Sequence, residues 1–126
     1  MRLILIVGTG SFIGGICRYL LSTFIQSKST SLFPYGTLMV NLIGCFLIGI
    51  IFGFFEKTQM STEWRLLLVT GVLGGFTTFS AFSGETFTLI KNGHAGLAFL
   101  YVLVSIAAGI SLTFFGAWII KTTTPS

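Results

Sequence analysis

Four long apolar runs divide this sequence, and they constrain the fold more than any other feature. A helix needs about 20 apolar residues to cross the roughly 30 Å hydrocarbon core of a bilayer, and each run is long enough to do so. We therefore expect a single membrane domain over residues 1–126, with spans at about 3–25, 34–55, 64–90 and 95–120.

The composition is typical of a chain that lies mostly in lipid. Apolar residues make up 53% of the sequence, charged residues only 8%, and the mean hydropathy is +0.97. The runs are too long and continuous for the short alternating strands of a membrane β-barrel, and an open sheet is not stable in lipid. The sequence predicts an all-α, multi-pass membrane protein, which we expect in the plasma (inner) membrane.

Basic residues are divided almost evenly between the two sides of the membrane. An even number of spans places both termini and the loop between spans two and three on one side. That side carries Arg2, Lys57, Arg65 and Lys121, and the other carries Lys28 and Lys91, joined by Arg18 if it reaches the surface. Four basic residues on one side against two or three on the other hardly select an orientation of the chain in the membrane. One interpretation is insertion in both orientations followed by assembly of an antiparallel two-fold homodimer. The other is that the loop charges are merely sparse.

Glycines four residues apart indicate that the helices pack closely. Small side chains at this spacing allow helix backbones to approach one another in lipid. The pairs are Gly10 and Gly14, Gly49 and Gly53, and Gly71 and Gly75. We expect them to lie at contacts within a tight bundle.

The third apolar run is predicted to break near its centre. Between Gly71 and Gly84 it is dense in Gly, Thr and Ser, a composition that weakens an uninterrupted helix. A broken membrane helix turns free carbonyl groups toward the protein interior, where they can bind a cation. The carbonyls of Gly74 and Thr77 are then candidate Na⁺ ligands. The alternative is an unbroken helix with a glycine-rich packing face.

Polar residues inside a span are candidate functional residues, because hydrocarbon makes them costly. Asn41 lies one helical turn after Thr37, so the two side chains lie on one face of the second span. The amide of Asn41 can donate a hydrogen bond to an anion. The alternative role is an ordinary hydrogen bond between helices.

Phe79 and Phe82 are three residues apart and lie on one side of the helix that follows the break. The edge of an aromatic ring carries partial positive charge, so two such edges can accept a small anion without offering it a full charge. Weak contacts of this kind suit conduction, which requires that an ion leave its site as readily as it enters. Because the chain has fourteen phenylalanines, packing or contact with lipid is the alternative role.

Other polar residues extend the candidate set. Arg18, near the end of the first span, is predicted to snorkel or to line a vestibule that attracts anions. Glu85 is the only acid well inside a span: one interpretation is that it is paired, protonated or placed near a helix end, and the other is that it marks a proton-coupled transporter. Tyr101 and Ser105 share one face of the fourth span, where they either line a hydroxyl track or join helices by hydrogen bonds.

The sequence does not predict an enzyme. It contains one histidine, and its two cysteines, Cys17 and Cys45, lie inside apolar runs without metal-ligand spacing. It has no phosphate-binding loop and no nucleophile–base pair. The basic residues are scattered, which argues against a nucleic-acid partner.

Three motifs make the chain similar to the Fluc (CrcB) fluoride channel family. They are GGFTTFSAF at 74–82, GTLMVNLIG at 36–44 and GGICR at 14–18, in the order and the helices that the family has. The likeness spans nearly the whole chain. It implies a passive, highly selective fluoride channel that exports fluoride after the neutral acid has entered the cytoplasm and dissociated.

The resemblance also implies an assembly. The family forms a dual-topology antiparallel homodimer with two fluoride pores and a structural Na⁺ at its centre. By motif position, the carbonyls that bind this Na⁺ belong to Gly74 and Thr77.

The site residues implied by the resemblance follow the same motifs. The pore amide falls on Asn41, and the paired pore phenylalanines fall on Phe79 and Phe82. Further candidates are Thr37, Tyr101 and Ser105 for the pore and Arg18 for the vestibule.

Two other classes of membrane protein are compatible with four spans and balanced charges. The first is a small dual-topology proton-coupled multidrug or cation antiporter, although its key acid normally lies in the first span, where this chain has none. The second is a small subunit that only scaffolds a larger complex. Passive fluoride conduction is the leading hypothesis.

Overall fold

Each apolar run forms a helix because a helix satisfies its own backbone hydrogen bonds, as lipid requires. The computed structural model describes residues 1–125. In it, α1 covers Arg2–Ser27, α2 covers Tyr35–Lys57 and α6 covers Ala95–Thr123. The third run is divided into α3 (Thr62–Arg65), a π-helical segment η1 (Leu66–Leu73), α4 (Gly74–Phe76) and α5 (Phe79–Lys91). The described chain therefore holds four helical segments that are long and apolar enough to cross a membrane.

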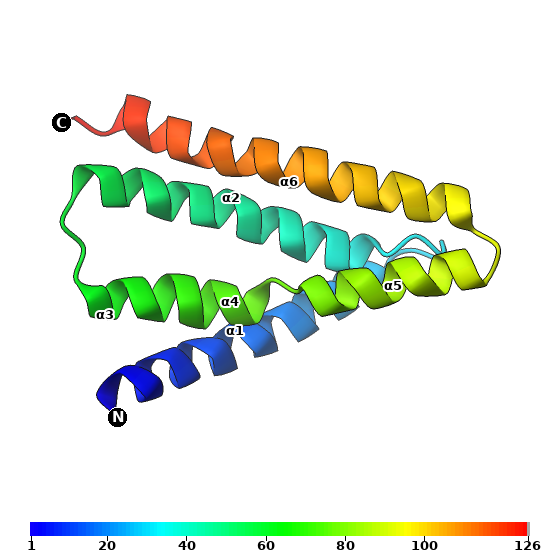
Figure 1. Cartoon of the computed structure of the whole chain (residues 1–126), viewed down its shortest axis with the longest axis horizontal. Helices are drawn as coiled ribbons and strands as arrows, with labels where there is room; N and C mark the ends of the chain where they lie inside the picture. The colour runs from blue at the N-terminus through cyan, green and yellow to red at the C-terminus, as the bar shows by residue number, and fades with distance from the viewer. Residues whose placement is uncertain (126) are drawn as a thin grey trace.

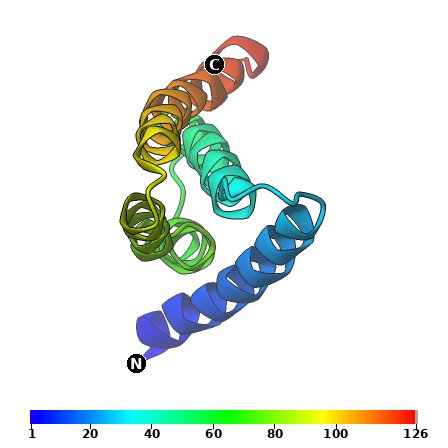
Figure 2. The same cartoon turned by 90° about the vertical axis from the view of Figure 1, so that its right-hand side faces the viewer.

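The four segments run back and forth along one axis. Both ends of the described chain and the α2–α3 loop lie at one end of the molecule, and the α1–α2 and α5–α6 loops lie at the other (Figure 1). Viewed along the bundle, α2 and the third segment lie between α6 and α1 (Figure 2). This arrangement agrees with the expected even number of spans.

Glycines allow the helices to approach closely, as predicted from their spacing. The most extensive contact joins α2 and α6, where Gly49 lies against the carbonyl of Thr113. On the other side of the molecule, α1 crosses η1 and α4. A Cβ atom built on Gly10 would lie 2.9 Å from the Cα of Gly71, and one on Gly75 would lie 2.5 Å from the carbonyl oxygen of Ser11. These positions have no room for a side chain.

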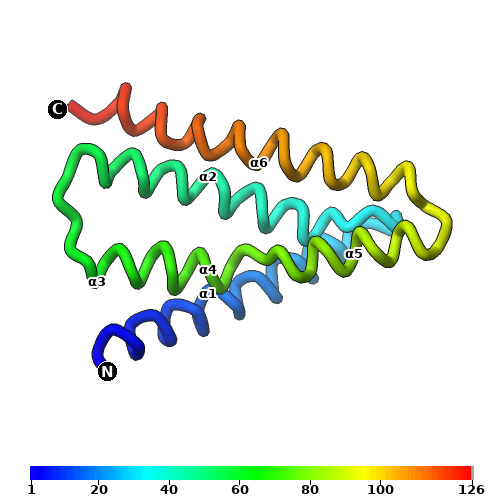
Figure 3. The backbone as a smooth tube through the Cα atoms, viewed as in Figure 1, coloured from blue at the N-terminus to red at the C-terminus, as the bar shows by residue number. Residues whose placement is uncertain are grey.

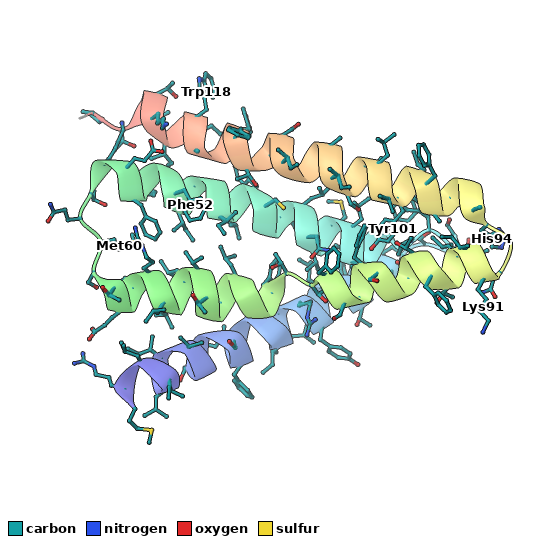
Figure 4. All side chains as sticks on the ribbon, viewed as in Figure 1. Phe52, Met60, Lys91, His94, Tyr101 and Trp118 are labelled. Carbon is teal, nitrogen blue, oxygen red and sulfur yellow. The ribbon has the colours of Figure 1, made fainter. Side chains whose placement is uncertain are left out.

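The buried core lies toward the end that holds the α1–α2 and α5–α6 loops. Its members are Phe33, Leu38, Leu89, Ala98 and Tyr101. Smaller numbers of apolar side chains are buried elsewhere, such as Leu73 and Phe76, while many large ones are exposed, as Trp118 on the outer side of α6 illustrates (Figure 4). Such a surface is expected where lipid replaces water as the solvent.

Candidate functional site

The predicted break in the third segment is present, between α4 and α5. Thr77 has φ −83° and ψ 153°, and Thr78 has φ −148° and ψ 120°, so both residues are extended. The tube in Figure 3 straightens at this point. A new helix starts at Phe79, where the Thr78 hydroxyl accepts a hydrogen bond from the amide N–H of Ala81 at 3.2 Å.

Asn41 on α2 binds the break with both ends of its side-chain amide. Its Nδ2 donates to the carbonyl oxygen of Thr78 at 3.0 Å, and its Oδ1 accepts from the Thr78 N–H at 2.8 Å. The two bonds satisfy backbone groups that the break would otherwise leave without partners. An amide nitrogen carries two hydrogens, so one N–H of Asn41 remains available to another acceptor.

The break also leaves free carbonyl groups. Within residues 1–125, the carbonyl oxygens of Gly74 and Thr77 accept no hydrogen bond. Gly74 keeps helical torsions, φ −63° and ψ −37°, and is exposed, whereas Thr77 is half-buried. The Thr77 hydroxyl bonds back to the Leu73 carbonyl at 2.8 Å and is therefore already engaged as a donor.

The two phenylalanines after the break lie side by side. The ring centroids of Phe79 and Phe82 are 5.6 Å apart, with an angle of 44° between the planes. Phe82 is half-buried and also contacts Tyr101, with a centroid distance of 5.1 Å. Phe79 is 79% exposed, so one face of this pair points away from its own chain.

A carboxylate joins the two hydroxyl residues that were predicted to lie on separate helices. Thr37 on α2 donates to Oε1 of Glu85 at 2.6 Å, and Tyr101 on α6 donates to Oε2 at 2.7 Å. Tyr101 is fully buried and lies between α6 and α5 (Figure 4). Glu85 was recognised from the sequence as an acid inside a span, but its two partners were not predicted.

A cavity of about 450 Å³ connects many of these residues. Ser105 lies one helical turn after Tyr101, and its buried Oγ has no hydrogen-bond partner among the described residues. The lining, all within residues 41–106, includes no charged side chain. It is formed by Asn41, Gly44, Cys45, Ile48, Val69, Leu73, Gly74, Thr77, Thr78, Phe79, Phe82, Ser105 and Ile106. The break therefore borders a mainly apolar space with a few hydrogen-bonding groups.

A second cavity of about 580 Å³ lies beyond Glu85, toward the α1–α2 loop. Thr37 and Glu85 line it together with polar residues of α1, among them Ser22 and Gln26. Asn41 lines the first cavity and Thr37 lines the second, and the two residues are one turn apart on α2. The two cavities therefore follow one another along α2, from the break toward the end of the molecule that holds the α1–α2 loop.

The family model described as "CrcB-like protein, Camphor Resistance (CrcB)" matches residues 5–117. The chain belongs to the CrcB family. A relative from Oceanobacillus iheyensis is 49% identical over 117 residues, which is 92% of this chain and 89% of the relative. Relatives from Leptospira interrogans, at 41% over 94% of both chains, and Agrobacterium fabrum, at 44% over 90% and 91%, are similar too. All three carry the name fluoride-specific ion channel FluC.

Membership of the CrcB family and four suitable helices make this chain a multi-pass membrane protein, located in bacteria in the plasma membrane. The names of the CrcB relatives give no support to the antiporter hypothesis.

The single chain does not bring every predicted site residue together. Arg18 is half-buried on α1, is not among the residues that line either cavity, and forms no ion pair with any described residue. Its vestibule role stays a prediction. Conversely, Thr78 was not singled out, although it provides both backbone partners of Asn41.

Proposed function

We propose that this chain conducts fluoride passively and selectively through the cavity at the break, and that it thereby exports fluoride from the cytoplasm. The observation that carries the proposal is the cavity lining, in which the Asn41 amide and the Ser105 hydroxyl lie beside two phenylalanines without any charged side chain. The names of the CrcB relatives support the same ion.

The chemistry of the lining suits a small, strongly hydrated anion. Fluoride must exchange its water for other hydrogen-bond donors, and the free N–H of Asn41 and the hydroxyl of Ser105 provide them. The ring edges of Phe79 and Phe82 add weak positive potential without a fixed cation. Such contacts hold an ion loosely enough to release it, whereas a buried lysine or arginine would bind it too tightly.

The proposed route continues from the cavity to the Thr37–Glu85–Tyr101 cluster. An ionised Glu85 would repel an anion, so we infer that fluoride passes on the side of the two hydroxyl groups. Thr37 and Tyr101 would exchange their hydrogen bond to Glu85 for one to the ion, which is a low-cost exchange between two strong acceptors. The second cavity then leads to the end of the molecule.

We further propose that the channel is an antiparallel homodimer. The charge distribution hardly favours one orientation, and the site is open on the surface of a single chain, where Phe79 and Gly74 are exposed. A second copy packed against this face would enclose the rings and exclude lipid. Two chains related by a two-fold axis would contain two equivalent pores.

The same arrangement suits a structural Na⁺ at the two-fold axis. The carbonyl oxygens of Gly74 and Thr77 are free of hydrogen bonds and therefore available to a hard cation, which prefers oxygen ligands. Two carbonyls from one chain leave a cation under-coordinated, and the same two from a second chain would enclose it. Na⁺ would then hold the two breaks in register.

Efflux from proteoliposomes tests the selectivity directly. Liposomes loaded with equal concentrations of fluoride and chloride should release fluoride rapidly and chloride hardly at all, because chloride is larger and a weaker hydrogen-bond acceptor. Protein-free liposomes provide the baseline. Equal release of the two anions would contradict a selective channel, and release that requires a proton gradient would point to a coupled transporter.

A further inference from the structure

The short loop between α1 and α2 is unusual because it contributes a core residue. Loops normally run over the surface with their side chains in solvent. Phe33 in this loop is only 5% exposed and belongs to the same buried cluster as Leu38, Leu89 and Tyr101. The loop is therefore part of the packing around the site.

Gln26, near the end of α1, holds this loop in place. Its Nε2 donates to the carbonyl oxygen of Phe33 at 3.3 Å, and its Oε1 accepts from the N–H of Gly36 at 3.0 Å. The N–H of Phe33 donates to the hydroxyl oxygen of Ser31 at 3.1 Å. Both backbone groups of Phe33 are thus bonded to side chains, and the first turn of α2 is tied to the last turn of α1.

The ring of Phe33 meets Tyr101 edge-on. Their centroids are 5.6 Å apart, with an angle of 74° between the planes. Phe82 contacts the ring of Tyr101 as well, with a centroid distance of 5.1 Å. Tyr101 is fully buried between these neighbours, and its hydroxyl reaches Glu85 at 2.7 Å. A tilt of the tyrosine ring would lengthen this hydrogen bond or bend it away from a favourable angle.

We propose that Gln26 and Phe33 are positioning residues, which orient the hydroxyl of Tyr101 toward Glu85 and hence toward the fluoride route. Phe33 lines neither cavity and acts through Tyr101. Gln26 also lines the second cavity, and it acts on Tyr101 through the two hydrogen bonds that hold Phe33 and the first turn of α2, so the efflux test uses the Phe33 variant. The inference rests on the proposed function only in assigning Tyr101 to that route. The orientation of the tyrosine itself can be tested without any measurement of transport.

Two substitutions test the aromatic contact of Phe33 and the hydrogen bonds of Gln26 separately. Phe33→Leu removes the aromatic contact and keeps an apolar side chain, whereas Gln26→Met keeps the length of the side chain and removes both hydrogen bonds. Matched controls are Phe114→Leu, at a ring that is 74% exposed on α6, and Gln59→Met, at an exposed glutamine in the α2–α3 loop. Tyr101→Phe identifies the signal of the tyrosine.

The first readout is NMR of the chain labelled with ¹³C at tyrosine Cζ, whose shift reports hydrogen bonding of the hydroxyl. The chain has only three tyrosines, so the Tyr101 signal can be assigned by its loss in Tyr101→Phe. Phe33→Leu and Gln26→Met should both shift this signal, and neither should shift that of Tyr19. Both controls should leave the Tyr101 signal unchanged. An unshifted Tyr101 signal in both variants would overturn the proposal.

The second readout is fluoride efflux from proteoliposomes at matched protein content. Phe33→Leu should lower efflux about two- to tenfold, the factor that corresponds to loss of one aromatic contact. Oligomeric state should match that of the controls. Loss of a core contact lowers the melting temperature of the variant, so efflux is compared well below that temperature. A shifted Tyr101 signal with normal efflux would overturn the functional part of the inference. If the wild-type chain fails to conduct fluoride, the proposed function fails, while the NMR result still decides whether the loop positions Tyr101.

Discussion

At the scale of single residues, Asn41 has one of the two roles that the sequence suggested as alternatives, and this role is compatible with the other, which we propose. It forms a hydrogen bond between helices, and the partner is the backbone of Thr78 at the break itself. Because this uses one Nδ2 hydrogen and the oxygen, the second hydrogen is left for an ion. The structural bond thereby fixes the orientation of the donor that we assign to fluoride.

Ser105 has a hydroxyl donor that forms no structural hydrogen bond, so its contribution to fluoride conduction can be tested separately from its contribution to stability. Its buried hydroxyl has no partner among residues 1–125, so Ser105→Ala should leave the free energy of unfolding unchanged or raise it. Fluoride efflux should fall about two- to tenfold if this hydroxyl contributes one hydrogen bond to the ion. Efflux and denaturation measurements check the two expectations. Ser111→Ala, at an exposed serine of the same helix, is the control. Undiminished efflux in Ser105→Ala would remove Ser105 from the route.

At the scale of the elements, the break was predictable because its cause is local. Glycine, threonine and serine weaken a helix wherever they gather, and the sequence shows them at 71–84. The bonds of Asn41 to Thr78 and of Glu85 to Thr37 were not predictable from spacing. Each joins residues far apart in the chain, 37 and 48 positions respectively, and depends on how the helices rotate against one another. The π-helical segment η1 likewise has no distinct sequence pattern.

The contact between α2 and α6 depends on glycines, and Gly116 tests this dependence. A Cβ atom at this position would lie 3.0 Å from the backbone nitrogen of Ile50. Gly116→Ala should therefore lower the free energy of unfolding by about 1–3 kcal/mol, the usual cost of overpacking. Gly96→Ala on the same helix has open space around it and should cost nothing. Reversible denaturation in detergent micelles compares the two, and equal stability would contradict close packing at Gly116.

At the scale of the whole molecule, the site is open on the surface of one chain, and the dimer that we propose would cover it. Gly74 and Phe79 face outward, and the cavity at the break is open. A second antiparallel copy would close the cavity and add two more carbonyls around Na⁺. The proposed dimer therefore links Na⁺ binding, dimer formation and fluoride conduction. A change that removes one of the three should lower the other two.

Removal of Na⁺ tests this link. Exhaustive exchange of Na⁺ for a large organic cation should lower both the dimeric fraction and fluoride efflux, since four carbonyl dipoles would then point at one another without a counter-charge. Return of Na⁺ should restore both. Cross-linking and efflux of the same preparation measure the two quantities. Full dimerisation and full efflux after exhaustive removal would contradict a structural role for the cation.

The most direct test of the central claim is fluoride efflux through Asn41→Asp, compared with Asn92→Asp in the exposed α5–α6 loop. The new carboxylate at position 41 still accepts from the Thr78 N–H, but it loses the donor and adds negative charge beside the cavity. Repulsion at close range should lower efflux by at least about 100-fold, while dimers still assemble. Asn92→Asp should conduct like the wild type. Efflux through Asn41→Asp equal to that of the wild type would show that fluoride does not pass this cavity.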